Sequence, residues 1–221
     1  QLAEVDVFSG WAFAWAFISS WLLRIIRKPF ILTLHGGNLP DFSRRFPGLV
    51  RYLLGHARKV IVPSTYLLKT LQVYRPDIIL IPNAIEINRY SFNKREVLRP
   101  VLIWLRAFHQ IYNPELAIRV MAKIHASYPN TRLIMVGPDR GDGSLQRAKK
   151  LIVGLGLEGS VEIPGGVPKS DVPLWLNRAD VFLNTTFYDN TPTSVMEAMA
   201  CGLCVISTNV GGIPYLLQHG Q

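Results

Sequence analysis

Short apolar runs alternate with segments of helical periodicity through the second half of the chain. The apolar runs have the length of buried strands and occur at residues 101–105, 132–136, 161–163, 179–184 and 205–207. Each pair is separated by a segment with helical spacing of apolar residues, such as residues 114–125, which Pro114 opens. This strict alternation of strand and helix predicts a doubly wound α/β fold with a parallel sheet.

The first half of the chain shows the same alternation less regularly. Strands are expected at residues 5–8, 30–34, 60–64 and 78–81, and helices at residues 44–56 and 65–73. Residues 88–100 are polar and basic and have no periodicity, which is typical of a linker. The pattern therefore predicts two domains, residues 1–97 and 98–221.

One apolar segment near the start, residues 7–23, carries no charge and is followed by Arg24, Arg27 and Lys28. Its length is at the lower limit for a membrane span, but one glycine, three serines and three tryptophans make it a poor span. Two other interpretations stay open. The segment is a helix that covers a parallel sheet, or it is such a helix with one face in the lipid interface, where Trp and Arg are favoured.

Charge is unevenly distributed along the chain. The net charge is +9, and residues 1–99 hold 14 Lys and Arg against 6 Asp and Glu, whereas residues 100–221 hold 10 against 9. The basic half suggests an anionic partner, namely a membrane surface or an acidic glycan; nucleic acid is disfavoured because no aromatic platform accompanies the charges.

The two cysteines, Cys201 and Cys204, form a CxxC that lacks further metal ligands, so we expect them to have a structural role. Because two cysteines make no disulfide framework, we expect a cytoplasmic protein, and peripheral attachment to the inner face of the membrane stays open.

The stretch from 179 to 217 carries the clearest candidate chemistry. After the strand at 179–184, a loop with Asp189 leads into a helix for which Thr193 or Ser194 is the expected N-cap, and Glu197 follows one turn later. A helix N-terminus attracts a phosphate, and carboxylates on either side of it can bind sugar hydroxyls. The alternative is that Asp189 is a turn residue and Glu197 an acid on the helix surface.

The Asp189-x7-Glu197 spacing, with the EAMACG and VGGIP segments that follow, resembles the donor-site signature of the GT-B retaining glycosyltransferases, glycosyltransferase family four. The family has Glu where this chain has Asp189. The resemblance implies a GT-B fold, two Rossmann-like domains with parallel sheets that face each other across a cleft, with an incomplete N-terminal domain and a truncated C-terminal end. It also implies transfer of a hexosyl-type sugar from a nucleotide-diphospho-sugar to an acceptor hydroxyl with retention of configuration, without a metal or a cofactor.

In family terms, Asp189 meets the transferred sugar and Glu197 meets the ribose hydroxyls. The backbone N–H groups of Thr193 and Ser194 meet the diphosphate, and Asn190 replaces a glycine of the donor loop. The acceptor, a glycan, a lipid-linked sugar or a small molecule, would bind the basic first domain.

Two basic side chains at strand ends complete the expected catalytic set of His35, Arg106 and Asp189. His35 and Gly36 stand in a T-x-H-G pattern that the family places beside the donor sugar. Arg106 follows the strand at 101–105, where a guanidinium can bind a diphosphate bidentately. The family lysine does not carry over, since Ile111 occupies its position. The remaining expected donor-binding residues follow other strands and are Asn83, Gly137, Gly165 and Gly166.

Two further functions stay open at this point. A nucleotide-sugar 2-epimerase shares the architecture, although more carboxylates would be expected in its cleft. The chain could also be an inactive module that binds a nucleotide sugar or a membrane, because the lysine is missing.

Overall fold

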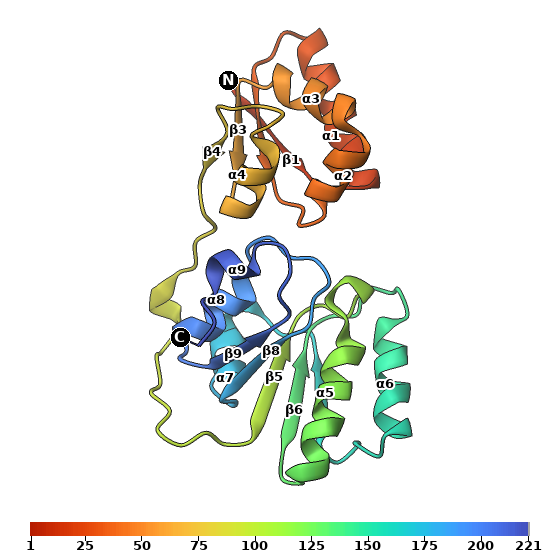
Figure 1. The fold of residues 1–221 in the computed structure, drawn as a ribbon, viewed down its shortest axis with the longest axis vertical. Coiled ribbons are helices and arrows are strands. Elements are labelled where there is room, and N and C mark those ends of the chain that lie inside the picture. The colour runs from red at the N-terminus through yellow and green to blue at the C-terminus, as the bar shows by residue number, and fades with distance from the viewer. Residues whose placement is uncertain (221) are drawn as a thin grey trace. The chain divides into compact units, whose positions relative to one another are not determined.

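The computed structural model describes residues 1–220, which divide into two compact units (Figure 1). The first unit contains residues 1–83, 188–191 and the described residues from 209 onward; the second contains residues 84–187 and 192–208. The loop at 188–191 therefore belongs to a different unit from the strand and helix on either side of it. The domain boundary after residue 97 stays a prediction, and residues 84–97 group with the second unit.

The first unit is built on a four-stranded parallel sheet in the order β1-β2-β3-β4. Its strands are β1 (Ala3–Val7), β2 (Phe30–Leu34), β3 (Lys59–Val62) and β4 (Ile79–Leu80). Its helices are α1 (Trp11–Ile25), α2 (Leu39–Arg45), α3 (Pro47–His56), α4 (Thr65–Leu71) and α9 (Ile213–Leu216). Helices α1, α2 and α3 gather on one side of this sheet (Figure 1). The apolar segment at 7–23 forms a covering helix only from Trp11 onward, since Val7 is the last residue of β1, and the helix continues to Ile25.

The single helix predicted at 44–56 is wrong, because α2 ends at Arg45 and α3 begins at Pro47. Phe46 between them has φ −128° and ψ 57°, outside the helical region. Proline disfavours the helical conformation in the residue before it and lacks an N–H donor, so the break falls at Phe46, directly before Pro47. Ser64 is the N-cap of α4, since its Oγ accepts a 3.1 Å hydrogen bond from the backbone N–H of Leu67.

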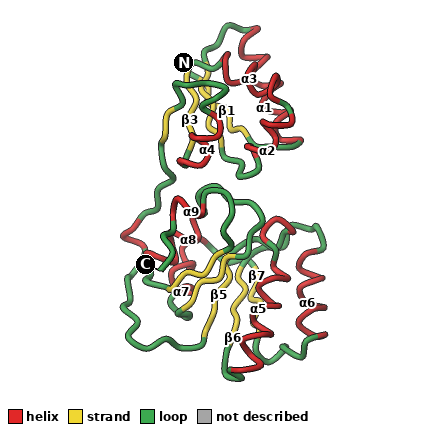
Figure 2. The backbone as a smooth tube through the Cα atoms, viewed as in Figure 1, coloured by secondary structure: helices red, strands yellow, loops and turns green. Residues whose placement is uncertain are grey.

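The second unit is built on a five-stranded parallel sheet (Figure 2). Its strands are β5 (Val101–Leu105), β6 (Arg132–Val136), β7 (Val161–Gly165), β8 (Val181–Asn184) and β9 (Cys204–Ser207). Its helices are α5 (Pro114–Ser127), α6 (Ser144–Gly154), α7 (Val172–Leu176) and α8 (Thr193–Ala200), with short 3-10 turns η1 (Ile87–Arg89), η2 (Gln110–Tyr112) and η3 (Lys169–Asp171). The predicted alternation of strands and helices is confirmed.

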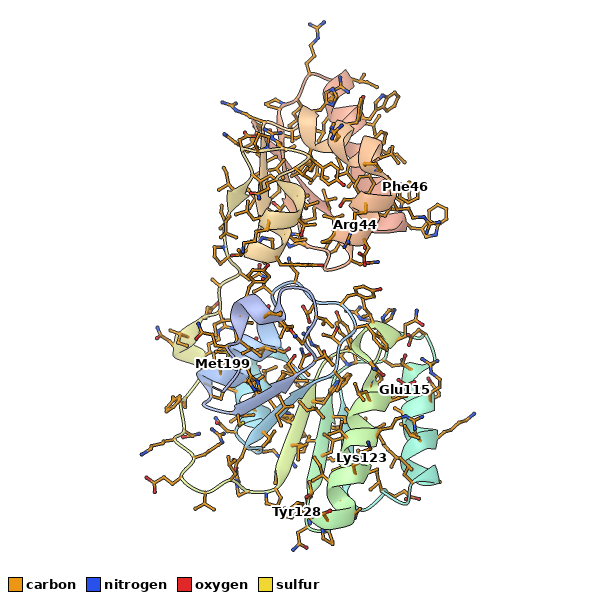
Figure 3. All side chains as sticks on the ribbon, viewed as in Figure 1. Arg44, Phe46, Glu115, Lys123, Tyr128 and Met199 are labelled. Carbon is orange, nitrogen blue, oxygen red and sulfur yellow. The ribbon has the colours of Figure 1, made fainter. Side chains whose placement is uncertain are left out.

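The order of the second sheet, β7-β6-β5-β8-β9, makes it doubly wound. The chain moves outward from β5 through β6 to β7, then returns to the other side of β5 and continues to β9. Right-handed crossovers in opposite directions place helices on opposite faces, with α5 and α6 on one side and α7 and α8 on the other (Figure 1). Helices α5 and α6 are joined by an ion pair of 2.8 Å between Glu115, labelled in Figure 3, and Arg147.

The predicted linker at 88–100 is fixed to the second unit through the carboxylate of Asp180, whose side chain is 1% exposed. Arg99 Nη2 and Arg95 Nε donate hydrogen bonds of 2.7 and 2.9 Å to Oδ1, and the backbone N–H of Arg99 donates one of 2.6 Å to Oδ2. The pKa of Asp180 lies well below its ordinary value, and the largest cause is the hydrogen bond from the Arg99 side chain.

Of the two cysteines, Cys201 is buried and Cys204 is exposed, and both are free thiols.

Candidate functional site

The chain reverses direction in the second sheet between β5 and β8, and ligands of doubly wound folds bind at this point, beyond the carboxyl ends of the strands. Arg106 follows β5 directly, and Asn184 is the last residue of β8. The Nε and Nη2 atoms of Arg106 lie 3.4 Å from Oδ1 of Asn184. The guanidinium carbon also lies 4.9 Å from the ring centroid of Tyr112. A positive charge is therefore held at the switch point.

Three expected glycines lie at this edge of the sheet, and one of them, Gly137, adjoins Arg106. A Cβ atom on Gly137 would lie 1.7 Å from the backbone oxygen of Arg106, so only glycine fits at this approach. The backbone N–H of Gly137 donates a 2.9 Å hydrogen bond to the carbonyl of Gly165. A Cβ on Gly166 would lie 3.3 Å from the Cβ of Pro138. The structure thus places Gly137 against the backbone of Arg106, with Gly165 and Gly166 next to residues 137 and 138 at the same edge of the sheet.

The start of α8 differs from the expected cap. Pro192 occupies the N-cap position without a side-chain hydrogen bond, and Thr193 is the first helical residue, so the prediction of Thr193 or Ser194 as the cap is wrong. The proline ring fixes φ of Pro192 at the end of the loop. The carbonyl of Pro192 accepts the first hydrogen bonds of the helix, from the N–H groups of Val195 at 3.1 Å and Met196 at 3.3 Å. The N–H groups of Thr193 and Ser194 have no acceptor within the helix.

Ser194 adds a second polar group at this helix start. The side chain is buried, with 8% of its surface exposed. Its Oγ has no hydrogen-bond partner within the described part of the chain, residues 1–220. Buried hydroxyls are normally paired, so an unpaired one beside backbone N–H groups that have no acceptor within the helix is what a site for an anionic ligand would show.

Glu197 lies one turn into α8 and is buried, with a side chain that is 2% exposed. The interpretation of Glu197 as an acid on the helix surface is therefore wrong. The Tyr90 hydroxyl donates a 2.9 Å hydrogen bond to Oε1, and the ammonium of Lys169 contacts the same oxygen. Burial, and then the hydrogen bond to Glu197, raise the pKa of Tyr90 above its ordinary value, so Tyr90 remains a donor at neutral pH.

Sequence reasoning missed Tyr90 and Lys169. Tyr90 lies in the segment interpreted as a linker, and Lys169 lies in the turn after β7, where a lysine is usually solvated. Nothing local in the sequence connects either residue with Glu197, since they are 107 and 28 positions away from it. A buried carboxylate needs such partners, because an unpaired charge in the interior costs several kcal/mol, about 3–5 when one partner is removed.

His35 in the first unit has a carboxylate partner that was also missed. Its Nε2 lies 2.9 Å from Oδ1 of Asp6 on β1, and the ring stacks on Phe8 with the centroids 5.4 Å apart. The backbone N–H of His35 donates to the carbonyl of Val7 at 3.0 Å. The side chain of His35 is 32% exposed, so the ring is fixed by Asp6 but open to a ligand. Gly36 beside it passes close to the backbone of residues 8 and 9.

The loop at 188–191 and Asn83 belong to the first unit together with His35. Asn190 Oδ1 accepts a hydrogen bond from the Ser64 hydroxyl, and Asn83 Nδ2 donates one of 3.2 Å to the carbonyl of Thr191. The Asp189 carbonyl accepts from the N–H of Gly212 at 3.1 Å. Asp189 and Glu197 thus belong to different units, although only seven residues separate them in the chain.

Two α/β units, each built on a parallel sheet, are the architecture of the GT-B class. The "Glycosyl transferases group 1" family model matches residues 87–221, and the "Glycosyltransferase Family 4" model matches residues 2–89. The chain belongs to the group 1 glycosyltransferase family.

Similar proteins of known sequence or structure are also glycosyltransferases or share their fold. The chain is 28% identical over 140 residues to the phosphatidylinositol N-acetylglucosaminyltransferase gpi3 subunit of Schizosaccharomyces pombe, over 62% of this chain and 30% of that protein. It thus spans about a third of that relative's length. Two solved structures share the fold. Anabaena Alr3699/HepE in complex with UDP and glucose has a TM-score of 0.76 and 21% sequence identity, and the match covers 97% of this chain and 62% of that one. Sucrose-phosphate synthase of Thermosynechococcus elongatus has a TM-score of 0.79 and 20% sequence identity, and the match covers 98% of this chain and 58% of that one. None of these matches favours the epimerase or the inactive module.

Proposed function

We propose that the chain transfers a sugar from a nucleotide-diphospho-sugar to an acceptor hydroxyl with retention of configuration, and needs no metal ion or cofactor. The observation that carries the proposal is the arrangement at the switch point. Arg106 and the start of α8 place positive charge there, and the buried carboxylate of Glu197 follows within one turn.

Each part of the donor has a matching group in the second unit. The N–H groups of Thr193 and Ser194, with the unpaired Ser194 hydroxyl, suit the diphosphate oxygens. Glu197 suits the two ribose hydroxyls, because a carboxylate fixed by Tyr90 accepts hydrogen bonds in a defined direction. The backbone around Gly165 and Gly166 suits the edge of the base. UDP is the first nucleotide to test, since HepE is described in complex with it.

The reaction breaks the bond between the anomeric carbon and the β-phosphate oxygen and forms one to the acceptor oxygen; the hydroxyl proton leaves to the diphosphate or to solvent. Charge develops on the departing diphosphate, and preorganised positive groups lower the barrier there. Arg106 and the helix start, which carries about half a positive charge, fill that role. His35, Gly36, Asn83, Asp189 and Asn190 are the groups of the first unit that we assign to the transferred sugar.

The test combines a binding measurement with turnover. We expect UDP to bind in a calorimetric titration, Glu197→Ala to raise the KM for the donor, and Asp189→Ala mainly to lower kcat. Glu158→Ala, at an exposed position of the second unit, is the control. Wild-type kinetics in both variants would contradict the site, and UDP release without an acceptor product would contradict the transferase. A thermal-shift panel of nucleotide sugars identifies the donor, since a ligand at 100 times its Kd adds about 2.7 kcal/mol of stability.

A further inference from the structure

Helix α1 of the first unit carries apolar side chains on both of its faces. Phe13, Ala16 and Ser20 are buried on one face. The opposite face is a stripe of residues spaced three or four positions apart, which places them one above the other along the helix. The stripe and its exposed fractions are Trp11 (89%), Trp15 (72%), Ile18 (46%), Leu22 (50%) and Ile25 (58%).

Such a stripe is unusual on a helix that faces water. Scattered exposed apolar residues are ordinary, but a contiguous patch marks an interaction surface. Two further apolar side chains of the same unit are exposed at the start of α3, namely Phe46 (38%) and Leu49 (44%), and Phe46 lies on the side where α1 to α3 gather (Figure 3).

A basic pocket lies at the C-terminal end of this helix. Its volume is about 390 Å³, and no acidic residue lines it. The charged and titratable residues of its wall are Arg24, Arg27, Lys28, His56 and Arg58. Four permanent positive charges around one hollow suit the phosphate of a lipid headgroup, since guanidinium groups bind phosphate bidentately.

Tryptophan is enriched where hydrocarbon meets headgroups, and clustered Lys and Arg next to an apolar helix face bind anionic lipids. We propose that α1 and the basic pocket form a membrane-binding surface, by which the first unit rests on a bilayer that contains anionic phospholipid. Trp11 and Trp15 enter the interface, and a lipid phosphate occupies the pocket. The surface is independent of the glycosyl transfer proposed above.

The geometry requires α1 to lie in the plane of the membrane. At 1.5 Å per residue its 15 residues extend about 22 Å, less than the hydrocarbon core of about 30 Å. No helix within residues 1–220 has the length and apolar character to cross a bilayer. The buried face of α1, with Phe13 4% exposed, also keeps the helix packed on its own unit.

The experiment is cosedimentation of the 221-residue chain with vesicles of phosphatidylcholine alone or mixed with phosphatidylglycerol. We expect binding to the anionic vesicles only, weakened by salt. Arg27→Gln with Lys28→Gln should lower the partition coefficient by about 25-fold, since each cation near the surface contributes about fivefold. Trp11→Ser with Trp15→Ser should lower it by about tenfold or more, because two large apolar side chains lose their burial.

Matched controls come from the second unit. Lys149→Gln with Lys150→Gln removes two exposed charges, and Val153→Ser with Leu174→Ser removes two exposed apolar side chains. Circular dichroism verifies that each variant is folded. The proposal is overturned if anionic vesicles do not bind the chain, or if the Trp11/Trp15 variant binds as well as its control. It is also overturned if light scattering shows that the stripe joins two copies of the chain in place of lipid.

Discussion

The hydroxyl of Tyr90 lies 2.9 Å from Oε1 of Glu197 and donates a hydrogen bond to it. Tyr90 follows the short turn η1, so a segment that looks like a linker in the sequence supplies a side chain to the site that we propose for the donor. Because the pKa of Tyr90 is raised, by burial and then by this bond, the hydroxyl stays protonated over the physiological range. One oxygen of the buried carboxylate therefore keeps a fixed position.

We expect Tyr90→Phe to raise the Kd for UDP by about tenfold, since a hydrogen bond to a charged group contributes about 1.5 kcal/mol or more. The ring still fills its place, so the free energy of unfolding should change by less than this. Calorimetric titration measures the affinity. Tyr128→Phe is the matched control, because Tyr128 is 67% exposed at the end of α5 (Figure 3). Equal affinities for the two variants would contradict a positioning role for Tyr90.

Lys169 contacts the same carboxylate oxygen, but its own side chain is 60% exposed. Solvent weakens this ion pair, so we expect a coupling energy of about 1–2 kcal/mol between Lys169 and Glu197. A double-mutant cycle of Lys169→Met and Glu197→Gln, followed by urea unfolding, measures it. Lys150→Met in the same cycle should give no coupling. A coupling energy of zero for Lys169 would mean that Tyr90 alone fixes the carboxylate.

The backbone of Arg106 passes so close to Gly137 that residue 137 has no room for a side chain. A Cβ at Gly137 would lie 1.7 Å from the backbone oxygen of Arg106, and that contact involves backbone atoms, which do not rotate away. We expect Gly137→Ala to lower the free energy of unfolding by about 2 kcal/mol or more and to weaken UDP binding through the displaced guanidinium. Gly159→Ala is the control, because a Cβ there has no atom within 4 Å. Equal stability of both variants would rule out the constraint.

Much of the second unit could be predicted from the sequence, because its signals are local. Apolar runs gave strands β5 and β6 with the observed ends, and the doubly wound order followed from the alternation with helices. The start of α8 was misassigned to Thr193 or Ser194, since side-chain preference for the cap position says nothing of a proline that already occupies it. The partners of Glu197 and His35 were out of reach, because such pairings depend on which chain segments the fold brings together.

Asp180 also has partners that are distant in the sequence, and its contribution to the free energy of unfolding depends on pH. Its carboxylate accepts hydrogen bonds from Arg95 and Arg99, and it is almost fully buried. The pKa in the folded protein is therefore lower than the value of about 3.9 in the unfolded chain. A group with a lowered pKa contributes stability that is fully present above the unfolded pKa and is lost as the pH falls through the folded one.

We expect Asp180→Asn to lower the free energy of unfolding by about 3 kcal/mol at neutral pH, since it leaves two arginines without their buried carboxylate. The difference from the wild-type protein should shrink steadily as the pH falls below about 4, where the unfolded Asp180 takes up a proton. Urea unfolding across this range measures both effects. Glu96→Gln, on the same segment but 79% exposed, should change little. A difference that stays constant with pH would show that Asp180 acts through its shape and hydrogen bonds, with no contribution from its charge.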